Sequence, residues 1–155
     1  MGSLTAHKGP ELVARAWGQR PGLPPLALYG PAVEPGLVPR LPPGLWRGEL
    51  PNAEVPRLLQ SARALVMGSI WPENAPLVVL EARAAGCPII APRIGGLPEL
   101  VEDGVDGRLY PPGDVEALGD AMEEVVSRSW PDVRPPPSFD VHLDGLESLY
   151  RGLRA

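Results

Sequence analysis

Two glutamates, Glu73 and Glu81, flank the start of a segment that the sequence predicts to be a buried helix. Pro76 suits the first helical position, because the N–H group that proline lacks has no intrahelical partner there. Leu, Val and Ala dominate the residues that follow. Such a helix points unpaired amide groups near Leu77 and Val78, together with the positive end of its dipole, out of its amino end. We expect a phosphate-like anion to bind there.

The positions of the two carboxylates suggest what else is bound. Glu81 follows Pro76 by five residues, or about 7.5 Å along a helix axis. A carboxylate on an apolar helix is costly unless it is hydrogen-bonded, and ligand hydroxyls could supply the bonds. Glu73 precedes the helix, so the pattern favours a phosphate between two hydroxyl-rich groups. Each glutamate also has a purely structural explanation that stays open. Glu73 could be an acid that the helix dipole favours, and Glu81 could form a buried ion pair with an arginine.

Strand-like and helix-like segments alternate along most of the chain, and this alternation predicts an α/β fold with a doubly wound, Rossmann-like parallel sheet. The expected strands cover residues 26–29, 44–48, 64–67, 88–91 and 107–110. The expected helices cover residues 10–19, 53–61, 76–85, 97–102, 115–127 and 143–153. We expect one domain over residues 1–130, followed by a Pro-rich connector and a final helix over residues 131–155.

In a doubly wound sheet, ligands bind beyond the carboxyl ends of the strands. The loop from Gly68 to Pro76 and the loop from Pro92 to Pro98 are therefore expected to line the site. Gly95 and Gly96, in the second loop, could let the backbone approach a ligand or could simply form a tight turn.

Composition excludes several classes of protein. The formal net charge is −5 and no window concentrates Lys or Arg, which argues against binding to nucleic acid. A single cysteine excludes an internal disulfide framework and suggests a reducing compartment, so we expect a cytoplasmic protein. No apolar run reaches the roughly 20 residues of a membrane span, which leaves only peripheral contact with a membrane.

The sequence resembles the donor-binding half of retaining GT-B glycosyltransferases, and specifically glycosyltransferase family four. The spacing of Glu73 and Glu81 is similar to the E-x7-E signature of that family. Residues 2–9 resemble its G-R-L-x-x-x-K-G motif, and residues 86–91 resemble G-x-P-V-I-A. Residues 94–101 resemble G-G-x-x-E-x-V, and residues 103–114 resemble D-G-x-x-G-x-L-x-x-P-x-D. Each motif is weak alone, but their shared order is specific.

The resemblance implies a role for each matching residue. Glu73 would bind hydroxyls of the donor sugar near the reacting carbon, and Glu81 would bind ribose hydroxyls. Lys8 would neutralise the donor diphosphate. The phosphates would be held by the backbone of Asn74, Ala75, Pro76 and Leu77.

The implied substrate is a nucleotide diphosphate-sugar, and no separate cofactor is expected. Fixed N–H donors and a lysine can stabilise the charge of the departing diphosphate without a metal ion. We therefore predict no metal site.

Two departures from the family pattern bear on function. Ser3 stands where the motif has an arginine, unless residues 1–3 are an artificial addition that happens to match it. The apolar strand expected before Gly2 is absent, and so is the N-terminal acceptor domain. We expect a sheet without its central strand. The chain would then be a truncated fragment, a chain whose missing part is supplied by a partner, or a degenerate relative of the family.

Two other functions compete with sugar transfer. In the first, the chain is a non-catalytic module that binds a sugar nucleotide or docks a partner. In the second, Glu73 and Glu81 hydrolyse a glycosidic bond, which requires two carboxyl groups about 5–9 Å apart across an open cleft. A glutamate on the flank of a buried helix suits hydrolysis poorly.

Overall fold

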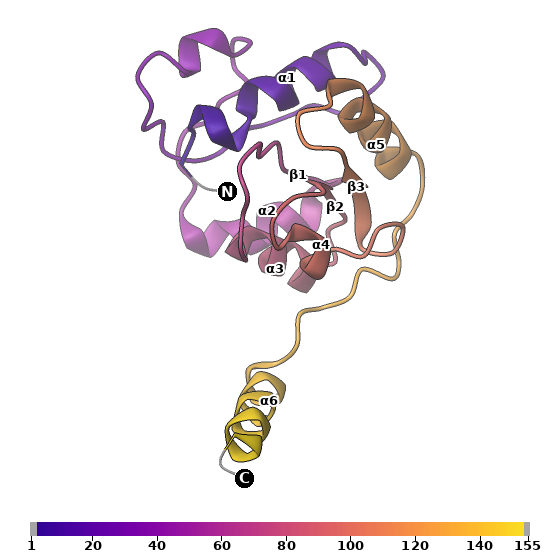
Figure 1. Cartoon of the computed structure of the whole chain (residues 1–155). Coiled ribbons are helices and arrows are strands. Elements are labelled where there is room, and N and C mark those ends of the chain that lie inside the picture. The colour runs from indigo at the N-terminus through magenta and orange to yellow at the C-terminus, as the bar shows by residue number, and fades with distance from the viewer. Residues whose placement is uncertain (1–2, 154–155) are drawn as a thin grey trace.

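The computed structural model describes residues 3–153, and its centre is a three-stranded parallel sheet. The strands are β1 (Leu65–Val66), β2 (Ile89–Pro92) and β3 (Gly107–Tyr110), in the order β1-β2-β3. Leu65 is in register with Ile89 of β2, which in turn is in register with Gly107 of β3. Helices cover both faces of this sheet (Figure 1), which confirms the α/β fold with a parallel sheet.

Two helical layers bury opposite faces of β2. Helices α1 (Pro10–Gly18) and α5 (Val115–Ser127) pack against each other and over Ile90. On the other face, Ile89 and Ala91 contact the layer of α2 (Val55–Ser61), α3 (Leu77–Ala84) and α4 (Leu97–Leu100). All four residues of β2 are buried, because alternate side chains of a central parallel strand enter cores on opposite faces.

The segments at residues 26–29 and 44–48 do not join the sheet, so this part of the sequence prediction is wrong. They pair with each other through an isolated parallel bridge between Leu28 and Trp46. The Leu28 N–H donates to the Leu45 carbonyl at 2.8 Å, and the Arg47 N–H donates to the Leu28 carbonyl at 2.9 Å. A short apolar run indicates an extended segment but does not identify its neighbour.

Several element boundaries also differ from the predictions. Pro76 is the N-cap of α3 rather than its first residue, with ψ of 123°. The final helix, α6, spans Phe139–Gly152 and so begins four residues earlier than expected. Ser138 explains this start, because its hydroxyl accepts a hydrogen bond from the Val141 N–H group. Three short 3-10 helices cover Ala6–Lys8, Val38–Arg40 and Asn52–Glu54.

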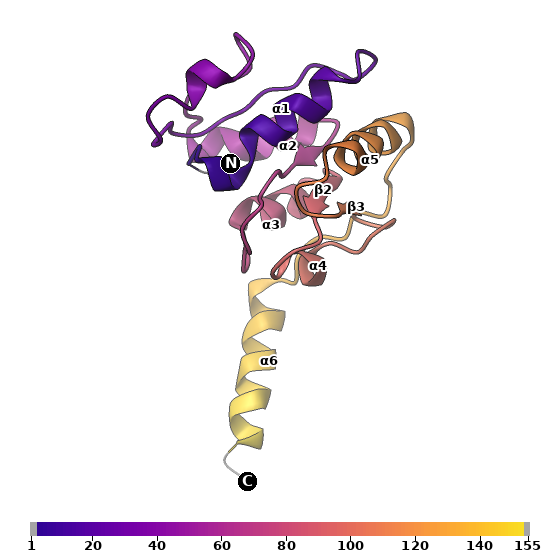
Figure 2. The same ribbon diagram turned by 45° about the horizontal axis from the view of Figure 1, so that its top comes forward.

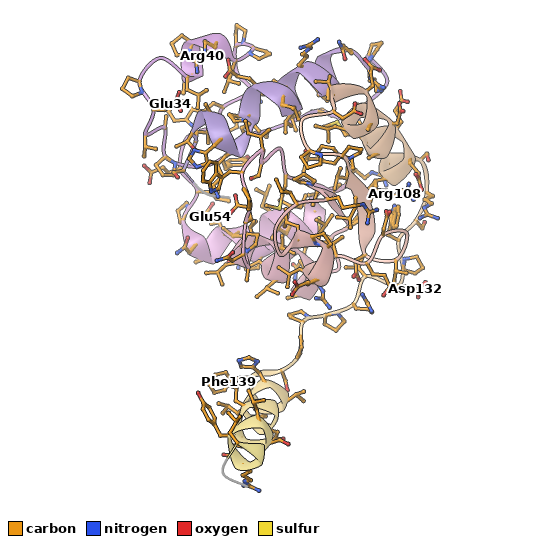
Figure 3. The ribbon with its side chains drawn as sticks, viewed as in Figure 1. Glu34, Arg40, Glu54, Arg108, Asp132 and Phe139 are labelled. Atoms are coloured by element: carbon orange, nitrogen blue, oxygen red, sulfur yellow. The ribbon has the colours of Figure 1, made fainter. Side chains whose placement is uncertain are left out.

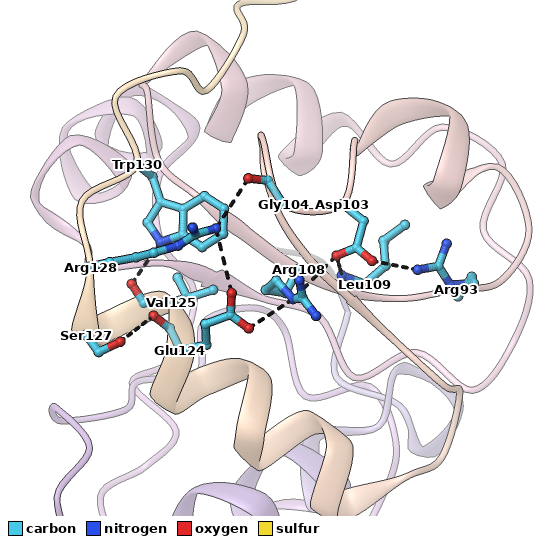
Figure 4. A network of polar contacts seen from close by, with 10 residues as sticks. All are labelled: Arg93, Asp103, Gly104, Arg108, Leu109, Glu124, Val125, Ser127, Arg128 and Trp130. Atoms are coloured by element: carbon cyan, nitrogen blue, oxygen red, sulfur yellow. Dashed lines mark hydrogen bonds and ion pairs between the residues drawn. The ribbon is translucent and has the colours of Figure 1, made fainter.

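Polar side chains join β3 to α5 and to the loop that precedes β3. Figure 4 shows Arg108 of β3 between Asp103 and Glu124, with Nε to carboxylate distances of 3.4 and 3.2 Å. Arg128, just after α5, lies over the ring of Trp130 with its guanidinium carbon 3.8 Å from the ring centroid. These contacts fix the outer edge of the sheet to the helix that covers it.

The Pro-rich connector is fastened to the domain at Arg134. Asp106 is fully buried and accepts hydrogen bonds from the Arg134 backbone N–H at 3.0 Å and from its guanidinium at 2.7 Å. Burial alone would raise the pKa of Asp106, but the bonds from Arg134 and from the Glu102 backbone hold it below its ordinary value. Arg83 of α3 donates to the Arg134 and Pro135 carbonyls from the other side.

Helix α6 extends away from the rest of the chain, as both views show (Figures 1 and 2). None of its described residues is buried, and Phe139, at its start, is 73% exposed (Figure 3). No helix within residues 3–153 has both the length and the apolar character needed to cross a bilayer.

Candidate active site

Glu73 and Lys8 form an ion pair in front of the sheet. The Lys8 Nζ lies 2.5 Å from Oε1 of Glu73, and the Ser69 hydroxyl donates to the same oxygen at 2.8 Å. The Glu73 side chain is 15% exposed, so it does not turn into bulk water. The structure therefore brings together the two residues that the sequence suggested for catalysis.

The charge state of Glu73 follows from these contacts. Partial burial would raise its pKa, but the hydrogen bonds from Lys8 and Ser69 and the nearby positive charge outweigh burial and lower the pKa. The carboxyl group is consequently an anion at neutral pH. It can accept hydrogen bonds from a ligand but has no proton to donate.

A close contact between two glycines places Lys8. Gly9 ends the 3-10 helix at residues 6–8 with φ of 64°, and a Cβ there would lie 1.9 Å from the Gly68 carbonyl oxygen. A Cβ on Gly68 would likewise lie 2.5 Å from the Gly9 carbonyl oxygen. Only glycine at both positions lets the Lys8 loop lie against the end of β1, beside Ser69.

Gly95 and Gly96 support the Glu73 loop from the other side. The Gly96 N–H donates to the Glu73 carbonyl at 2.7 Å. A Cβ on Gly95 would lie 2.4 Å from that carbonyl oxygen, and one on Gly96 would lie 2.1 Å from the Asn74 carbonyl oxygen. Gly95 also has φ of 59°, which favours glycine. Both residues thus hold the backbone of residues 73–74 in place.

The amino end of α3 faces the same region. The first backbone bond of the helix runs from the Val79 N–H to the Pro76 carbonyl, and within residues 3–153 no side chain caps the helix start. A hollow of about 130 Å³ lies beside it, and its lining includes Ser3, Lys8, Pro76 and Val78. Among the residues that the structure describes, no side chain is therefore bonded to the end of this helix.

Glu81 lies on the flank of α3 and is half-buried. Within residues 3–153 its carboxylate has no salt bridge or hydrogen-bond partner, so the structure does not show the arginine pair that the sequence left open. Leu77 is exposed, whereas Val78 and Val79 are buried. The carboxylate remains available to an external donor of hydrogen bonds.

Sequence reasoning placed Gly68 and Ser69 in the loop expected to line the site but assigned neither of them a role. Ser69 is buried and holds Glu73, but a serine after a strand is too common to signal such a role. Gly68 could have been found, because a glycine at the end of a predicted strand indicates a close backbone approach. Among residues 3–153, no three His, Cys, Asp or Glu side chains lie close enough together to hold a metal ion.

Comparison with known proteins identifies a family. The family "Glycosyl transferases group 1" matches residues 45–134, which is more than half of the chain. D-inositol 3-phosphate glycosyltransferase of Mycolicibacterium smegmatis is 33% identical over 138 residues, covering 83% of this chain and 32% of that protein. Sulfoquinovosyl transferase SQD2 of Arabidopsis thaliana is 39% identical over 77 residues, covering 48% of this chain and 15% of that protein.

Solved structures agree with this match. HepE of Anabaena, in complex with UDP-glucose, superposes with a TM-score of 0.70 at 26% identity, covering 85% of this chain and 40% of that one. AviGT4, a glycosyltransferase of avilamycin A biosynthesis, superposes with a TM-score of 0.63, also at 26% identity, covering 86% of this chain and 43% of that one. The chain spans about a third of the length of the first of these curated relatives.

Proposed function

This chain belongs to the group 1 glycosyltransferases, and from that premise we propose that it is the donor-binding domain of a retaining sugar transferase. The donor is a nucleoside diphosphate-sugar. The observation that carries the proposal is the ion pair of Lys8 and Glu73 beside the uncapped amino end of α3. The ammonium group of Lys8 and the amide groups at the start of α3 suit a diphosphate, and the carboxylate of Glu73 suits sugar hydroxyls. A nucleoside diphosphate-sugar carries both kinds of group.

The proposed chemistry follows from these charges. When the bond between the anomeric carbon and the diphosphate oxygen breaks, its electron pair leaves with the diphosphate. Lys8 and the backbone amides of residues 74–77 stabilise that charge, because they are already fixed where it develops. In this role they replace a metal ion. Glu73, once Lys8 turns to the diphosphate, accepts hydrogen bonds from hydroxyls of the donor sugar.

Glu81 binds the ribose hydroxyls in this proposal. It lies further along α3 than the amide end, and its carboxylate has no partner among the described residues. A nucleotide whose phosphates meet the helix start therefore has its ribose beside Glu81. HepE, at 26% identity, was solved with UDP-glucose and with UDP, which supports a nucleotide-sugar donor for this chain.

The acceptor site is proposed to lie outside these 155 residues. The relative from M. smegmatis and HepE are both much longer, since this chain covers 32% and 40% of them. An N-terminal acceptor domain, or a partner chain in its place, would supply that site. We expect the domain alone to bind donor but to transfer little sugar.

Isothermal titration calorimetry with UDP, GDP and ADP tests the proposal. At least one nucleotide should bind with Kd below ~1 mM, corresponding to about −4 kcal/mol. Lys8→Gln should weaken that binding at least tenfold, because it removes the cation that meets the diphosphate. Arg57→Gln is the matched control, since Arg57 is exposed on α2. Binding of none of the three nucleotides at millimolar concentration would contradict the proposal.

A non-catalytic role remains the competing function, and Ser3 favours it, because one diphosphate cation of the family motif is missing. The two functions differ when the chain is joined to the acceptor domain of a relative. Transfer of radiolabelled sugar that Glu73→Gln abolishes would support catalysis. Donor binding without any transfer would support the binding module.

A further inference from the structure

Glu34 contacts the short turn that carries Lys8. The 3-10 helix at residues 6–8 is a single turn, closed by a bond from the Gly9 N–H to the Ala6 carbonyl at 2.9 Å. So short a 3-10 helix has little stability of its own, and its first amide groups have no partner inside it. Contacts with other parts of the chain must therefore fix its position.

The residue that would ordinarily cap this turn does not do so. Thr5 is the N-cap residue, but its side chain makes no capping hydrogen bond within the described residues. Its hydroxyl lies 3.2 Å from the Nε2 atom of His7 instead. The Ala6 N–H donates to the carboxylate of Glu34, 28 residues further along the chain, at 2.6 Å. Glu34 therefore bonds an amide of the first turn, which is a role that the N-cap side chain usually fills.

Arg40 holds the Glu34 carboxylate and ties it to α1. The Arg40 guanidinium donates to Glu34 at 3.5 Å and to Glu11 of α1 at 2.8 Å. Glu34 and Arg40 lie on the same outer loop (Figure 3). Leu37, between them, is fully buried in a cluster with Leu4, so the loop is anchored in the core. The carboxylate that meets the turn is consequently fixed by the loop and by α1.

The turn is thus held at both of its ends. At the carboxyl end, Gly9 lies against Gly68, and the Ile70 N–H donates to the His7 carbonyl at 2.9 Å. At the amino end, the turn is held by the Glu34 carboxylate. A cation stabilises developing charge best when it is fixed in place before the charge appears. Both attachments therefore bear on where the ammonium group of the turn can lie.

We propose that Glu34 is a positioning residue of the proposed donor site, because its carboxylate fixes the turn from which Lys8 reaches Glu73. Arg40 contributes by orienting that carboxylate. The Glu34 side chain is 36% exposed and that of Arg40 is 45% exposed, and ion pairs so exposed add little to stability. Loss of the contact should consequently displace Lys8 without unfolding the domain. The inference rests on the proposed function for the identity of the ligand, but the position of Lys8 can be measured without one.

Titration of the Glu73 carboxyl group by carbon-13 NMR, without nucleotide, tests the proposal. Glu34→Ala removes the acceptor of the Ala6 N–H. It should raise the pKa of Glu73 by about half a pH unit or more, since the Lys8 ammonium then spends less time beside that carboxylate. Glu34→Gln keeps an acceptor oxygen and should leave the pKa of Glu73 near that of the parent. Loss of the Glu34 charge alone would lower this pKa, so the sign of the change separates the two causes.

Further variants complete the test. Arg40→Gln removes the contact that orients Glu34 and should raise the pKa of Glu73 by less than Glu34→Ala does, which gives a second measurement if Glu34→Ala does not fold. Combined with Lys8→Gln, Glu34→Ala should no longer raise this pKa. Glu54→Ala is the control, because Glu54 is exposed and has no salt bridge among the described residues. Calorimetry should show UDP binding weakened about fivefold by Glu34→Ala.

Three results would overturn the proposal. The first is a pKa of Glu73 in Glu34→Ala that equals or lies below that of the parent. The second is an equal rise in Glu34→Gln, or a rise that persists together with Lys8→Gln. The third is a UDP affinity of Glu34→Ala equal to that of a parent chain that binds UDP. If no chain binds UDP, the proposed function fails, and the titration of Glu73 still decides whether Glu34 positions Lys8.

Discussion

Lys8 forms an ion pair with Glu73 in this structure, so its ammonium group must leave that carboxylate before it can bind a phosphate. The family resemblance implied a separate ligand for each residue, because a motif shows which residues matter and not how their side chains contact each other. A partly buried anion and a nearby cation reduce their desolvation cost by pairing. Ser69 completes the pair, and no spacing rule pointed to it.

The lowered pKa of Glu73 makes its contribution to stability dependent on pH. A carboxyl with a folded-state pKa below its unfolded value of 4.5 stabilises the fold above that value, and the effect is lost as pH falls through the folded pKa. Glu73→Gln should therefore lower the free energy of unfolding by about 1–2 kcal/mol at pH 7. The loss should be smaller at pH 3.

Urea denaturation at the two pH values measures this difference. Glu54→Gln is the control, because Glu54 is exposed and is without a salt bridge among the described residues (Figure 3). A cost of Glu73→Gln that is the same at both pH values, or larger at pH 3, would show that the ion pair does not stabilise the fold.

Ser3 offers a second test at the scale of one residue. It lines the same hollow as Lys8, at the position where the family motif has an arginine. Ser3→Arg should tighten UDP binding about tenfold, because a guanidinium forms strong bonds to phosphate. Ser3→Gln adds a polar side chain without the charge and should leave affinity unchanged. Calorimetry at low and high salt checks this, and equal affinities of the two variants would contradict it.

Helix periodicity and cap residues predicted most elements, and tertiary pairing accounts for the errors. Asp114 caps α5, because its carboxylate accepts from the Ala117 N–H at 3.0 Å. The apolar run at residues 107–110 became β3 with the expected bounds. The run at residues 26–29 is similarly apolar, but it forms only an isolated bridge, between Leu28 and Trp46. Which segment pairs with residues 26–29 depends on the tertiary arrangement, and a local sequence pattern does not indicate that arrangement.

The loop between β2 and α4 gives a prediction at the scale of elements. Gly95→Ala places a methyl group 2.4 Å from the Glu73 carbonyl oxygen, at a φ of 59°, so the loop of residues 73–74 must shift. We expect nucleotide affinity to fall at least tenfold. Gly113→Ala is the control, because Gly113 also has a positive φ but has open space around it.

Calorimetry and thermal melts separate the two variants. Both should lose about 1 kcal/mol from the strained backbone, and only Gly95→Ala should lose affinity. If the two variants bind nucleotide equally well, the glycine pair is only a turn and does not position Glu73.

At the scale of the whole molecule, the fold divides into a packed body and an arm. The sequence predicted a Pro-rich connector at the start of residues 131–155, but not that Arg134 would be bonded to buried Asp106, 28 residues earlier in the chain. A local sequence pattern cannot indicate a contact between residues that lie so far apart in the chain. Beyond this attachment, α6 contributes no buried residue to the body.

Two truncated chains should therefore behave differently. A chain that ends at Pro136 keeps Arg134 and should melt at the same temperature as the parent, because residues 137–153 are all exposed. A chain that ends at Val133 leaves buried Asp106 without its guanidinium and should lose about 2–3 kcal/mol. Circular dichroism melts check both, and equal melting temperatures for the two truncations would refute the importance of this contact.

The ion pair at the proposed donor site also has a consequence for which solutes can enter. A simple anion that draws Lys8 away leaves a partly buried carboxylate without its counter-charge, and a neutral sugar that engages Glu73 leaves the ammonium without one. In each case the new contact with the solute is offset by the loss of the ion pair between Lys8 and Glu73. A molecule that carries negative charge and hydroxyls together satisfies both groups in one step, so the proposed site would favour such a conjugate over the separate phosphates and sugars of a cell.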